Sequence, residues 1–205
     1  TPCGTLFPYT TLFRSVDMEA IHPKASKALE TAGIGIRVKN AFEPEHRGTL
    51  ITKDYICPES RIEIITGSDK MTSLQIHDTR MVGEVGFDLR ITQVLVDHGL
   101  SFICKMTNAN TIEILVKDKE YSRGVLRDLK NNFEKVLIAQ VAIVCVIGSN
   151  IAKPGIMAMA AKALADQGIN ILAVSQTSRQ TNMQFIVERK DFIEAQKVLH
   201  RALCE

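Results

Sequence analysis

Two stretches of the chain resemble each other and decide its fold. The first is VGFDLRITQVLVDHGLSFICKMT, residues 85–107, and the second is PGIMAMAAKALADQGINILAVSQ, residues 154–176. In each, apolar residues recur at the i, i+4, i+7, i+8 spacing that gives a helix one apolar face. An Asp-x-Gly sequence then ends the helix, because glycine readily adopts the left-handed conformation found there. An apolar strand follows in both, at Leu100–Thr107 and at Ile169–Gln176, so the chain contains an internal repeat.

The repeat continues on both sides of these stretches. After a loop that is two residues longer in the second copy, Thr111–Val116 aligns with Asn182–Val187 as an alternating strand. A second helix follows in each copy, beginning at Tyr121 in the first and spanning Asp191–Cys204 in the second. The opening strands are expected at Ser73–His77 and Val141–Ile147. Each unit therefore has the order strand, helix, strand, strand, helix.

This order predicts an α+β fold with two ferredoxin-like βαββαβ units in tandem. Unit one gains a fourth strand at Val136–Gln140, whereas the sheet of unit two is left with an unfilled edge. The unassigned strand Arg61–Thr66 can fill that edge. We therefore expect the first unit at residues 70–139 and a discontinuous second unit at residues 58–69 and 140–205. The alternative is that Arg61–Thr66 pairs with the N-terminal segment.

The composition argues against several classes of protein. The balance of 25 Lys and Arg against 23 Asp and Glu lacks the strong positive field that nucleic-acid binders use. The longest apolar run, Val136–Ile147, is shorter than the roughly 20 residues of a membrane-spanning helix. Five cysteines without a Cys-x-x-Cys pair give no zinc or disulfide pattern and fit a reducing cytoplasm. An RNA-recognition module would need stacking aromatics on its central strands, where only Phe102 and Phe185 occur.

The first fifteen residues differ from the rest of the chain. Thr5–Ser15 matches the in-frame translation of a common sequencing adapter, and it lacks the basic start, apolar run and cleavage site of a signal peptide. We therefore expect residues 1–15 to be a non-native leader, native sequence to begin near Val16, and the chain to be a C-terminal fragment. The alternative is a natural disordered or strand-like leader, and the encoding codons decide between the two.

Residues 16–57 precede both units. Pro23–Gly33 is expected to form a helix that starts at a proline and stops at a glycine. Ile34–Val38 is then a short strand and residues 40–48 are a polar loop. Lys53–Ser60, which contains Pro58, is expected to be a linker.

Three short motifs in this segment look like the end of an amino-acid kinase domain. They are His22-Pro23 before a helix, the strand Arg37-x-x-Asn40, and the exit Gly48-Thr-Leu-Ile51. With the two units that follow, residues 17–205 resemble aspartate kinase. The resemblance implies a remnant of an α/β amino-acid kinase domain at residues 16–57, followed by tandem ACT domains that bind a feedback amino acid. It also implies a parent enzyme that phosphorylates aspartate with ATP and magnesium in lysine, threonine and methionine synthesis.

No catalytic machinery is expected in this chain itself. The family's nucleotide site begins with a Lys-containing Gly-Gly strand end that does not occur here, and Gly33-x-Gly35 lacks the third glycine of a dinucleotide fingerprint. We therefore expect no catalytic residue, cofactor or metal site, and no activity of the chain alone. The alternative is a free-standing ACT protein that binds an amino acid, although such a module has no use for the segment ending at Ile51.

The effector site follows from what a free amino acid requires. Its carboxylate favours unpaired backbone amides, and its ammonium favours oxygen atoms. In unit one a glycine-containing loop leads into the first helix, and the next strand forms the opposite wall. In unit two the loop starts at Gly148-Ser149-Asn150. By resemblance, the ligand lies where ACT units of two chains meet, which implies a homodimer. The candidate effector-binding residues are Met81, Gly83, Glu84, Val85, Gly86, Phe87, Ser101, Phe102, Ile103, Asn170 and Ile171.

The sequence leaves the effector open between lysine and threonine, with methionine as a third candidate. Family members that sense lysine carry an acidic residue where this chain has Ile103, and a buried ammonium without a partner is costly. Glu84 in the facing loop could take that role. Threonine needs no second partner for a cation.

Overall fold

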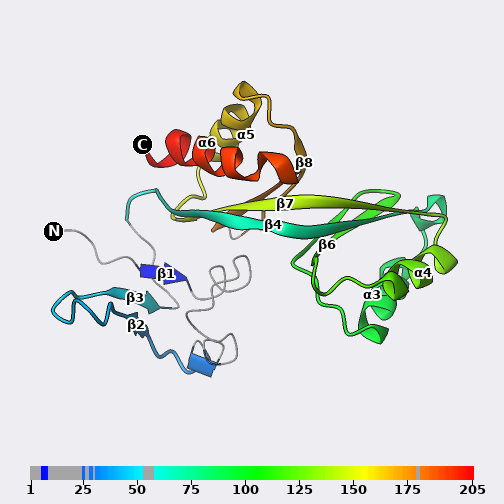
Figure 1. Cartoon of the computed structure of the whole chain (residues 1–205), viewed down its shortest axis with the longest axis horizontal. Helices are drawn as coiled ribbons and strands as arrows, with labels where there is room; N and C mark the ends of the chain where they lie inside the picture. Colours follow the sequence, from blue (N-terminus) through cyan, green and yellow to red (C-terminus); the bar gives the residue numbers. More distant parts are fainter. Residues whose placement is uncertain (1–5, 9–24, 26–27, 30, 53–57, 179–180) are drawn as a thin grey trace.

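The computed structural model describes residues 6–8, 25, 28–29, 31–52, 58–178 and 181–205. Two long antiparallel strands, β4 (Arg61–His77) and β7 (Lys135–Ser149), form the middle of a six-stranded sheet. The strand order is β5-β6-β4-β7-β9-β8 (Figure 1). A second sheet in the described part has three short strands, in the order β1-β3-β2.

Unit one is built on the half of β4 that ends at His77 and the half of β7 that starts at Lys135. Its other elements are η1 (Thr79–Met81), α3 (Phe87–Asp97), β5 (Cys104–Thr107), β6 (Thr111–Lys117) and α4 (Arg123–Asn132). The strand expected from Leu100 begins only at Cys104. The Leu100 amide is not available to a strand, because it donates a hydrogen bond to the Leu95 carbonyl at the end of α3. The helix expected from Tyr121 begins two residues later, after Ser122 as its N-cap.

Unit two repeats this arrangement along the other halves of β4 and β7. Its elements are α5 (Ile156–Asp166), β8 (Ile171–Ser175), β9 (Asn182–Glu188), η2 (Arg189–Asp191) and α6 (Phe192–Cys204). β8 is shorter at both ends than the expected strand Ile169–Gln176. The two βαββαβ units and their antiparallel sheet confirm the predicted fold class.

The units share one sheet because β4 and β7 each run through both of them. Residues 61–68 of β4 pair with residues 143–149 of β7, and residues 71–77 pair with residues 135–141. Arg61–Thr66 therefore lies beside β7 in unit two. The prediction of separate strands for Ser73–His77, Val136–Gln140 and Val141–Ile147 was wrong, since no turn interrupts either long strand.

Gly67 lies in β4, just before this strand passes from unit two to unit one. A Cβ atom at this position would lie 2.0 Å from the carbonyl oxygen of Ile143, so only glycine fits between the strands. The register shifts just after it, between Ser68 and Met71. Such a bulge bends a strand and increases its twist without ending it.

Side chains of β7 alternate between two faces along its whole length. Val136 enters the core of unit one, and the even-numbered residues Ala142, Val144 and Val146 enter the core of unit two. These residues share one face of the pleat. The twist of the ribbon rotates this face along the strand, so α5 and α6 lie above the ribbon in Figure 1 and α3 and α4 below it.

A third hydrophobic cluster covers the helix-free face of the sheet. It includes Met71 of β4, Cys104 of β5 and Ile186 of β9, with Ala173 of β8 packed against it. β5 and β8 stand at opposite ends of the strand order, yet some of their Cα atoms lie within 8 Å of each other. The sheet therefore curls until its two edges approach. Burial in this cluster raises the pKa of the Cys104 and Cys145 thiols to about 12.

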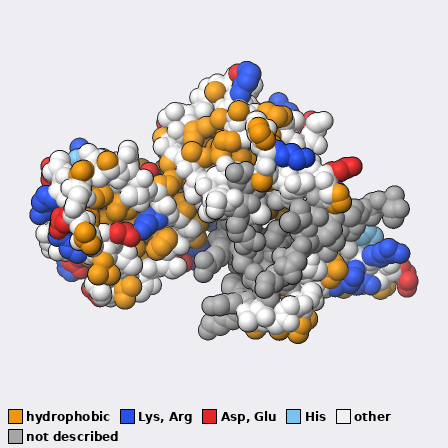
Figure 2. Space-filling view, turned by 180° about the vertical axis from the view of Figure 1, so that it is seen from behind, with side chains coloured by type: hydrophobic (Ala, Val, Ile, Leu, Met, Phe, Trp, Pro, Cys, Tyr) orange, Lys and Arg blue, Asp and Glu red, His pale blue; other side chains and the backbone are white. Residues whose placement is uncertain are grey.

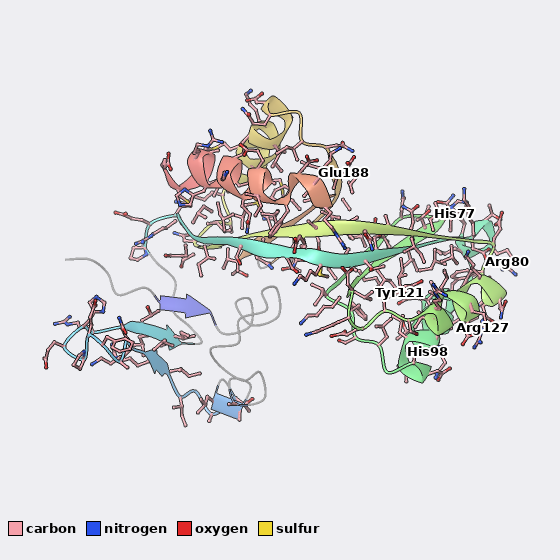
Figure 3. The ribbon with its side chains drawn as sticks, viewed as in Figure 1. His77, Arg80, His98, Tyr121, Arg127 and Glu188 are labelled. Atoms are coloured by element: carbon pink, nitrogen blue, oxygen red, sulfur yellow. The ribbon has the colours of Figure 1, made fainter. Side chains whose placement is uncertain are left out.

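The helices of unit one are joined by a polar contact as well as by their core. His98, labelled in Figure 3, is the C-cap of α3. Its Nε2 atom lies 2.8 Å from Oδ2 of Asp128 on α4. Hydrogen bonds from Arg127 and then from His98 lower the pKa of Asp128. A Cβ on Gly124 would come within 3.0 Å of the His98 ring, so the two helices pack closely at this point.

The N-terminal segment contributes the three-stranded sheet. β3 (Thr49–Thr52) pairs in parallel with β1 (Leu6–Pro8) and in antiparallel with β2 (Ile36–Val38). β1 lies within residues 1–15, the expected non-native leader. The non-native origin of these residues stays a prediction, which the encoding codons would test. The helix expected at Pro23–Gly33 and the linker expected at Lys53–Ser60 lie partly outside the described residues. No helix in the described part is long and apolar enough to cross a membrane.

Candidate functional site

The loop between β4 and α3 holds the first group of candidate residues. Met81 is almost completely buried at its base, whereas the side chain of Val85 is 99% exposed. Gly83 and Gly86 have φ angles of +80° and +83°, which glycine adopts at little cost. No atom lies within 4 Å of the place where a Cβ would be at either glycine. The loop therefore projects into open space.

The end of this loop is the N-terminus of α3. Gly86 is the N-cap, and no side chain caps the helix. The first amides of a helix have no intrahelical acceptors and favour an anion. Phe87 anchors the helix start by packing on Phe133, with ring centroids 5.4 Å apart. The structure thus offers backbone amides next to a fixed aromatic residue, which suits a ligand carboxylate.

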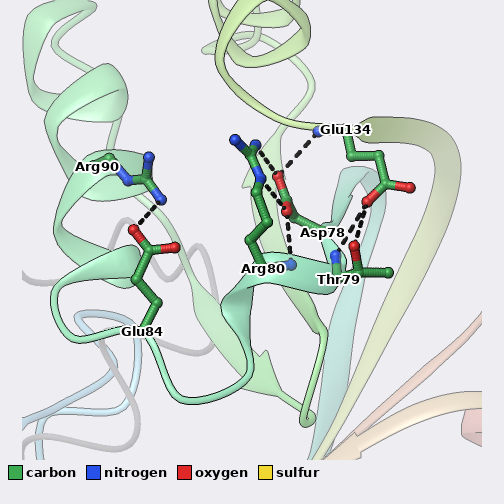
Figure 4. Close-up of polar contacts among 6 residues, drawn as sticks. All are labelled: Asp78, Thr79, Arg80, Glu84, Arg90 and Glu134. Atoms are coloured by element: carbon green, nitrogen blue, oxygen red, sulfur yellow. Dashed lines mark hydrogen bonds and ion pairs between the residues drawn. The ribbon is translucent and has the colours of Figure 1, made fainter.

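Glu84 is already engaged in the loop. Its Oε1 atom lies 3.1 Å from Nη2 of Arg90 (Figure 4). The Arg90 guanidinium also lies over the Phe87 ring, 4.5 Å from the ring centroid. Glu84 is therefore paired in this structure with a cation of the chain itself, which makes it a weaker partner for the ammonium group of a ligand.

A buried carboxylate at the start of the loop was missed by the sequence analysis. Asp78 is fully buried and accepts hydrogen bonds from Nε, Nη2 and the backbone amide of Arg80 and from the backbone amide of Glu134 (Figure 4). These bonds, with the Arg80 side chain as the largest contributor, hold the pKa of Asp78 far below its usual range. An aspartate just after a strand is typical of an N-cap, so this residue could have been found.

The predicted opposite wall, Ser101–Ile103, follows the C-terminal end of α3. Ser101, Phe102 and Ile103 line a hollow of about 740 Å³ together with Lys117, Glu120 and residues from the C-terminal half of α3. The loop stands at the other end of this helix, which is about 16 Å long for eleven residues. Residues 81–87 of the loop do not line this hollow, and the assignment of both walls to one effector site stays a prediction. Lys117 and Glu120, which belong to the hollow, had no signal in the sequence.

An ion pair connects β5 to the loop end of α3. Nζ of Lys105 lies 2.6 Å from Oδ2 of Asp88 in the first turn of the helix. β5 follows directly after Ser101–Ile103, so the chain passes from the hollow toward the loop. The two predicted walls are thus adjacent along one face of unit one, although they do not enclose a common cavity.

The corresponding loop of unit two is built differently. Gly148 is closely packed, because a Cβ there would lie 2.6 Å from the carbonyl oxygen of Arg61. Asn150 has a φ angle of +52°, and its Nδ2 atom donates to the carbonyl oxygen of Pro58 at 3.0 Å. Asn170 is exposed and Ile171 is partly buried against the core of unit two. This loop is therefore tied to the chain at its start, whereas its end at Gly155, the N-cap of α5, has a φ angle of +97° and no side-chain cap among the described residues, as at Gly86 of unit one.

The two aromatic residues considered for base stacking occupy different environments. Phe185 is fully buried in the core of unit two, so it cannot stack on a base. Phe102 is 42% exposed and lines the hollow of unit one. Neither arrangement provides the aromatic platform of an RNA-recognition module.

Comparison with known proteins defines the class. Residues 144–203 match the ACT domain family. Aspartate kinase Ask_Ect of Stutzerimonas stutzeri is 38% identical over 194 residues, which cover 93% of this chain and 41% of that protein. The chain is therefore an ACT-domain protein. It belongs with the aspartate kinases and corresponds to their ACT-containing regulatory region. It spans about two fifths of the length of the curated relatives it matches.

Solved structures agree with this assignment. Clostridium acetobutylicum aspartate kinase has a TM-score of 0.83 at 25% identity, covering 98% of this chain and 48% of that chain. Escherichia coli aspartokinase III in complex with lysine and aspartate has a TM-score of 0.76 at 18% identity, covering 98% of this chain and 46% of that chain. The regulatory subunit of Thermus flavus aspartate kinase has a TM-score of 0.62 at 15% identity, covering 69% of this chain and 98% of that chain. The last two show a shared fold.

Proposed function

We propose that the chain is the amino-acid-sensing part of an aspartate kinase that phosphorylates L-aspartate with ATP and magnesium in lysine, threonine and methionine biosynthesis. The observation that carries this proposal is the similarity to Ask_Ect, which extends over 93% of the chain and so beyond the two ACT units. That extent disfavours a free-standing ACT protein. ATP and magnesium belong to the parent enzyme, and no residue of this chain is proposed to bind them.

The effector pocket is proposed to form between two chains. The open loop of unit one, residues 81–87, and the wall at Ser101–Ile103 supply one part. Asn170 and Ile171 of a second chain supply the other. Two observations support this arrangement: the start of α3 has no side-chain cap among the described residues, and the loop residues do not line the hollow beside Ser101–Ile103.

The proposed effector is lysine or threonine. Aspartokinase III of Escherichia coli has been solved with lysine bound, which supports lysine as one candidate. The pairing of Glu84 with Arg90 makes Glu84 a weaker partner for the lysine side chain, and this favours threonine. Both amino acids are therefore tested side by side, with methionine third.

Asn170→Ala is expected to weaken the effect of the ligand on the thermal melt. Binding to the folded state alone stabilises it by about 2.7 kcal/mol at a hundredfold excess over Kd, which is roughly 5–10 °C in Tm for a chain of this size. Asn170 is exposed, so the substitution should change the free energy of unfolding without ligand by no more than about 0.5 kcal/mol. Asn131→Ala, at an exposed position of α4, is the control. An unchanged ligand-induced shift in Asn170→Ala would exclude this residue from the pocket.

A homodimer is proposed because hydrophobic side chains reach the surface on both units, as Figure 2 shows for one face. Large apolar residues exposed on unit one are Val82, Val85, Leu89, Val96 and Phe102, and those on unit two are Met159, Leu172, Val174 and Ile193. Exposed apolar surface of this kind is typical of contact sites. Sedimentation at tens of micromolar should give a dimer, and a strictly monomeric chain would contradict this proposal.

The remaining proposals concern organisation and location. We propose three parts: an N-terminal segment of residues 16–57, a first ACT domain of residues 70–139, and a second ACT domain made of residues 58–69 and 140–205. The pairing of residues 61–68 with the unit-two half of β7 supports this division. A cytoplasmic location is supported by Cys104 and Cys204, which form no disulfide among the described residues, since disulfides are rare in reducing compartments.

A further inference from the structure

The loop of unit one is held at both ends by two consecutive residues, Phe133 and Glu134. At the entry, Oε2 of Glu134 accepts hydrogen bonds from the backbone amide of Thr79 at 3.1 Å and from its hydroxyl at 3.0 Å. The Glu134 amide in turn donates to Oδ2 of Asp78 at 3.1 Å. At the exit, the Phe133 ring packs on Phe87. We call the hydrogen bonds among Asp78, Thr79 and Glu134 the entry clip (Figure 4).

The entry clip is reciprocal and electrostatically favourable. The buried Asp78 carboxylate is balanced by the Arg80 guanidinium, with Nη2 and Oδ2 2.6 Å apart. The pKa of Glu134 is lowered by hydrogen bonds from the Thr79 amide and hydroxyl and, to a smaller extent, by the nearby His77. These effects outweigh burial and the negative charge of Asp78, which both raise it. Both carboxylates are therefore ionised acceptors at neutral pH, and charged acceptors make the stronger hydrogen bonds.

Between the two anchors, Met81 is buried at the base of the loop and Glu84 pairs with Arg90. The rest of the loop is held less: Val82 is 65% exposed and Val85 is 99% exposed, so burial does not fix their positions. Gly83 and Gly86 lie in the left-handed region, where glycine adds backbone freedom. The shape of this exposed part therefore depends on how the two ends of the loop are held.

The clip belongs to unit one alone. The residue at the position of Asp78 in unit two is Gly148, whose amide donates to the Thr181 carbonyl as the Asp78 amide donates to the Asn110 carbonyl. Glycine has no side chain that could accept the hydrogen bonds of the clip. The corresponding loop of unit two is instead tied through Asn150 to Pro58. A change in the clip should therefore act on one loop and leave the other unaffected.

We propose that Asp78 and Glu134 are positioning residues that pre-organise the unit-one loop for the amino-acid effector, an inference that rests on the proposed function above. A loop held in its binding shape loses less conformational entropy when the ligand binds. Because Glu134 touches the loop entry and lies before β7, it acts on the ligand through the backbone of residues 79–86.

The test uses the full chain and three substitutions in the clip and one outside it. Glu134→Ala removes the acceptor, Glu134→Gln keeps an acceptor oxygen, and Thr79→Val removes only the hydroxyl donor. Glu188→Ala, at an exposed residue of unit two that pairs with Lys190, is the matched control. Hydrogen exchange of residues 81–90 is measured without ligand, and the Kd for L-lysine and L-threonine is measured by calorimetry.

Glu134→Ala should speed exchange in residues 81–90 about fivefold or more and weaken the Kd about 5- to 10-fold. Thr79→Val and Glu134→Gln should have smaller effects in the same direction, because the first keeps the backbone donor and the second keeps a neutral acceptor oxygen. Glu188→Ala should stay within about twofold of the wild-type chain. Unchanged exchange in Glu134→Ala would overturn the inference, as would equal effects of Gln and Ala. If the wild-type chain binds but Glu134→Ala binds as tightly, the inference alone fails. If the wild-type chain binds none of the amino acids, the proposed function fails and the inference with it.

Discussion

Replacing Phe185 by alanine is expected to lower the free energy of unfolding by about 3–5 kcal/mol. Phe185 is fully buried and stands in the middle of β9, opposite Val144 on β7 and Val174 on β8. Its ring fills the core of unit two between the sheet and the helices. Truncation leaves a cavity lined by side chains of three strands, which cannot collapse without breaking strand pairing. Chemical denaturation followed by far-UV circular dichroism measures the loss.

Phe42→Ala is the matched control, because Phe42 is 95% exposed. The same chemical change should alter the free energy of unfolding there by no more than about 0.5 kcal/mol. Equal effects at the two positions would mean that Phe185 does not occupy the core of unit two.

Gly67→Ala is expected to cost near the upper end of the roughly 1–3 kcal/mol of an overpacked site. The added methyl group would lie 2.0 Å from the carbonyl oxygen of Ile143 and 3.1 Å from Cε2 of Phe192. The first contact is with backbone, so β4 and β7 must separate where β4 crosses between the units. Denaturant titration measures the loss, and hydrogen exchange should localise it to residues 61–70 and 141–149.

Gly35→Ala is the control for this substitution. The nearest atom to a Cβ at Gly35 is Cδ1 of Leu50 at 3.4 Å, an ordinary van der Waals contact. This change should be neutral, or stabilising by up to about 1 kcal/mol because alanine restricts the unfolded chain. A tolerated Gly67→Ala would contradict the continuous pairing of β4 with β7.

Local patterns were sufficient to predict the first helix of each unit. The apolar spacing from Phe87 to Leu95 predicts α3, and its repeat from Ile156 to Leu164 predicts α5, because each stripe packs on a sheet. Glycines at positions 99 and 168 end these helices, with φ angles of +62° and +69°. These features depend on neighbours in sequence, so the sequence alone contains them.

Features that depend on distant contacts were not predicted. The stretch Gly67–Lys70 has the composition of a turn, but pairing with β7 keeps it extended. The hollow beside Ser101 includes Lys117 and Glu120, which are brought there by the pairing of β5 with β6. The entry clip joins Asp78 to Glu134, 56 positions later in the chain. Such contacts arise from the register of strands, which the sequence pattern leaves undetermined.

We propose that this chain binds an amino acid as the regulatory region of an aspartate kinase. Calorimetric titration of the full chain with L-lysine, L-threonine and L-methionine tests it most directly, with D-lysine and D-threonine as controls for stereospecific recognition. We predict saturable binding of at least one L-amino acid and none of its D-enantiomer at the same concentration. No heat of binding from any of the three at millimolar concentration, for a chain shown to be folded and dimeric, would contradict the claim.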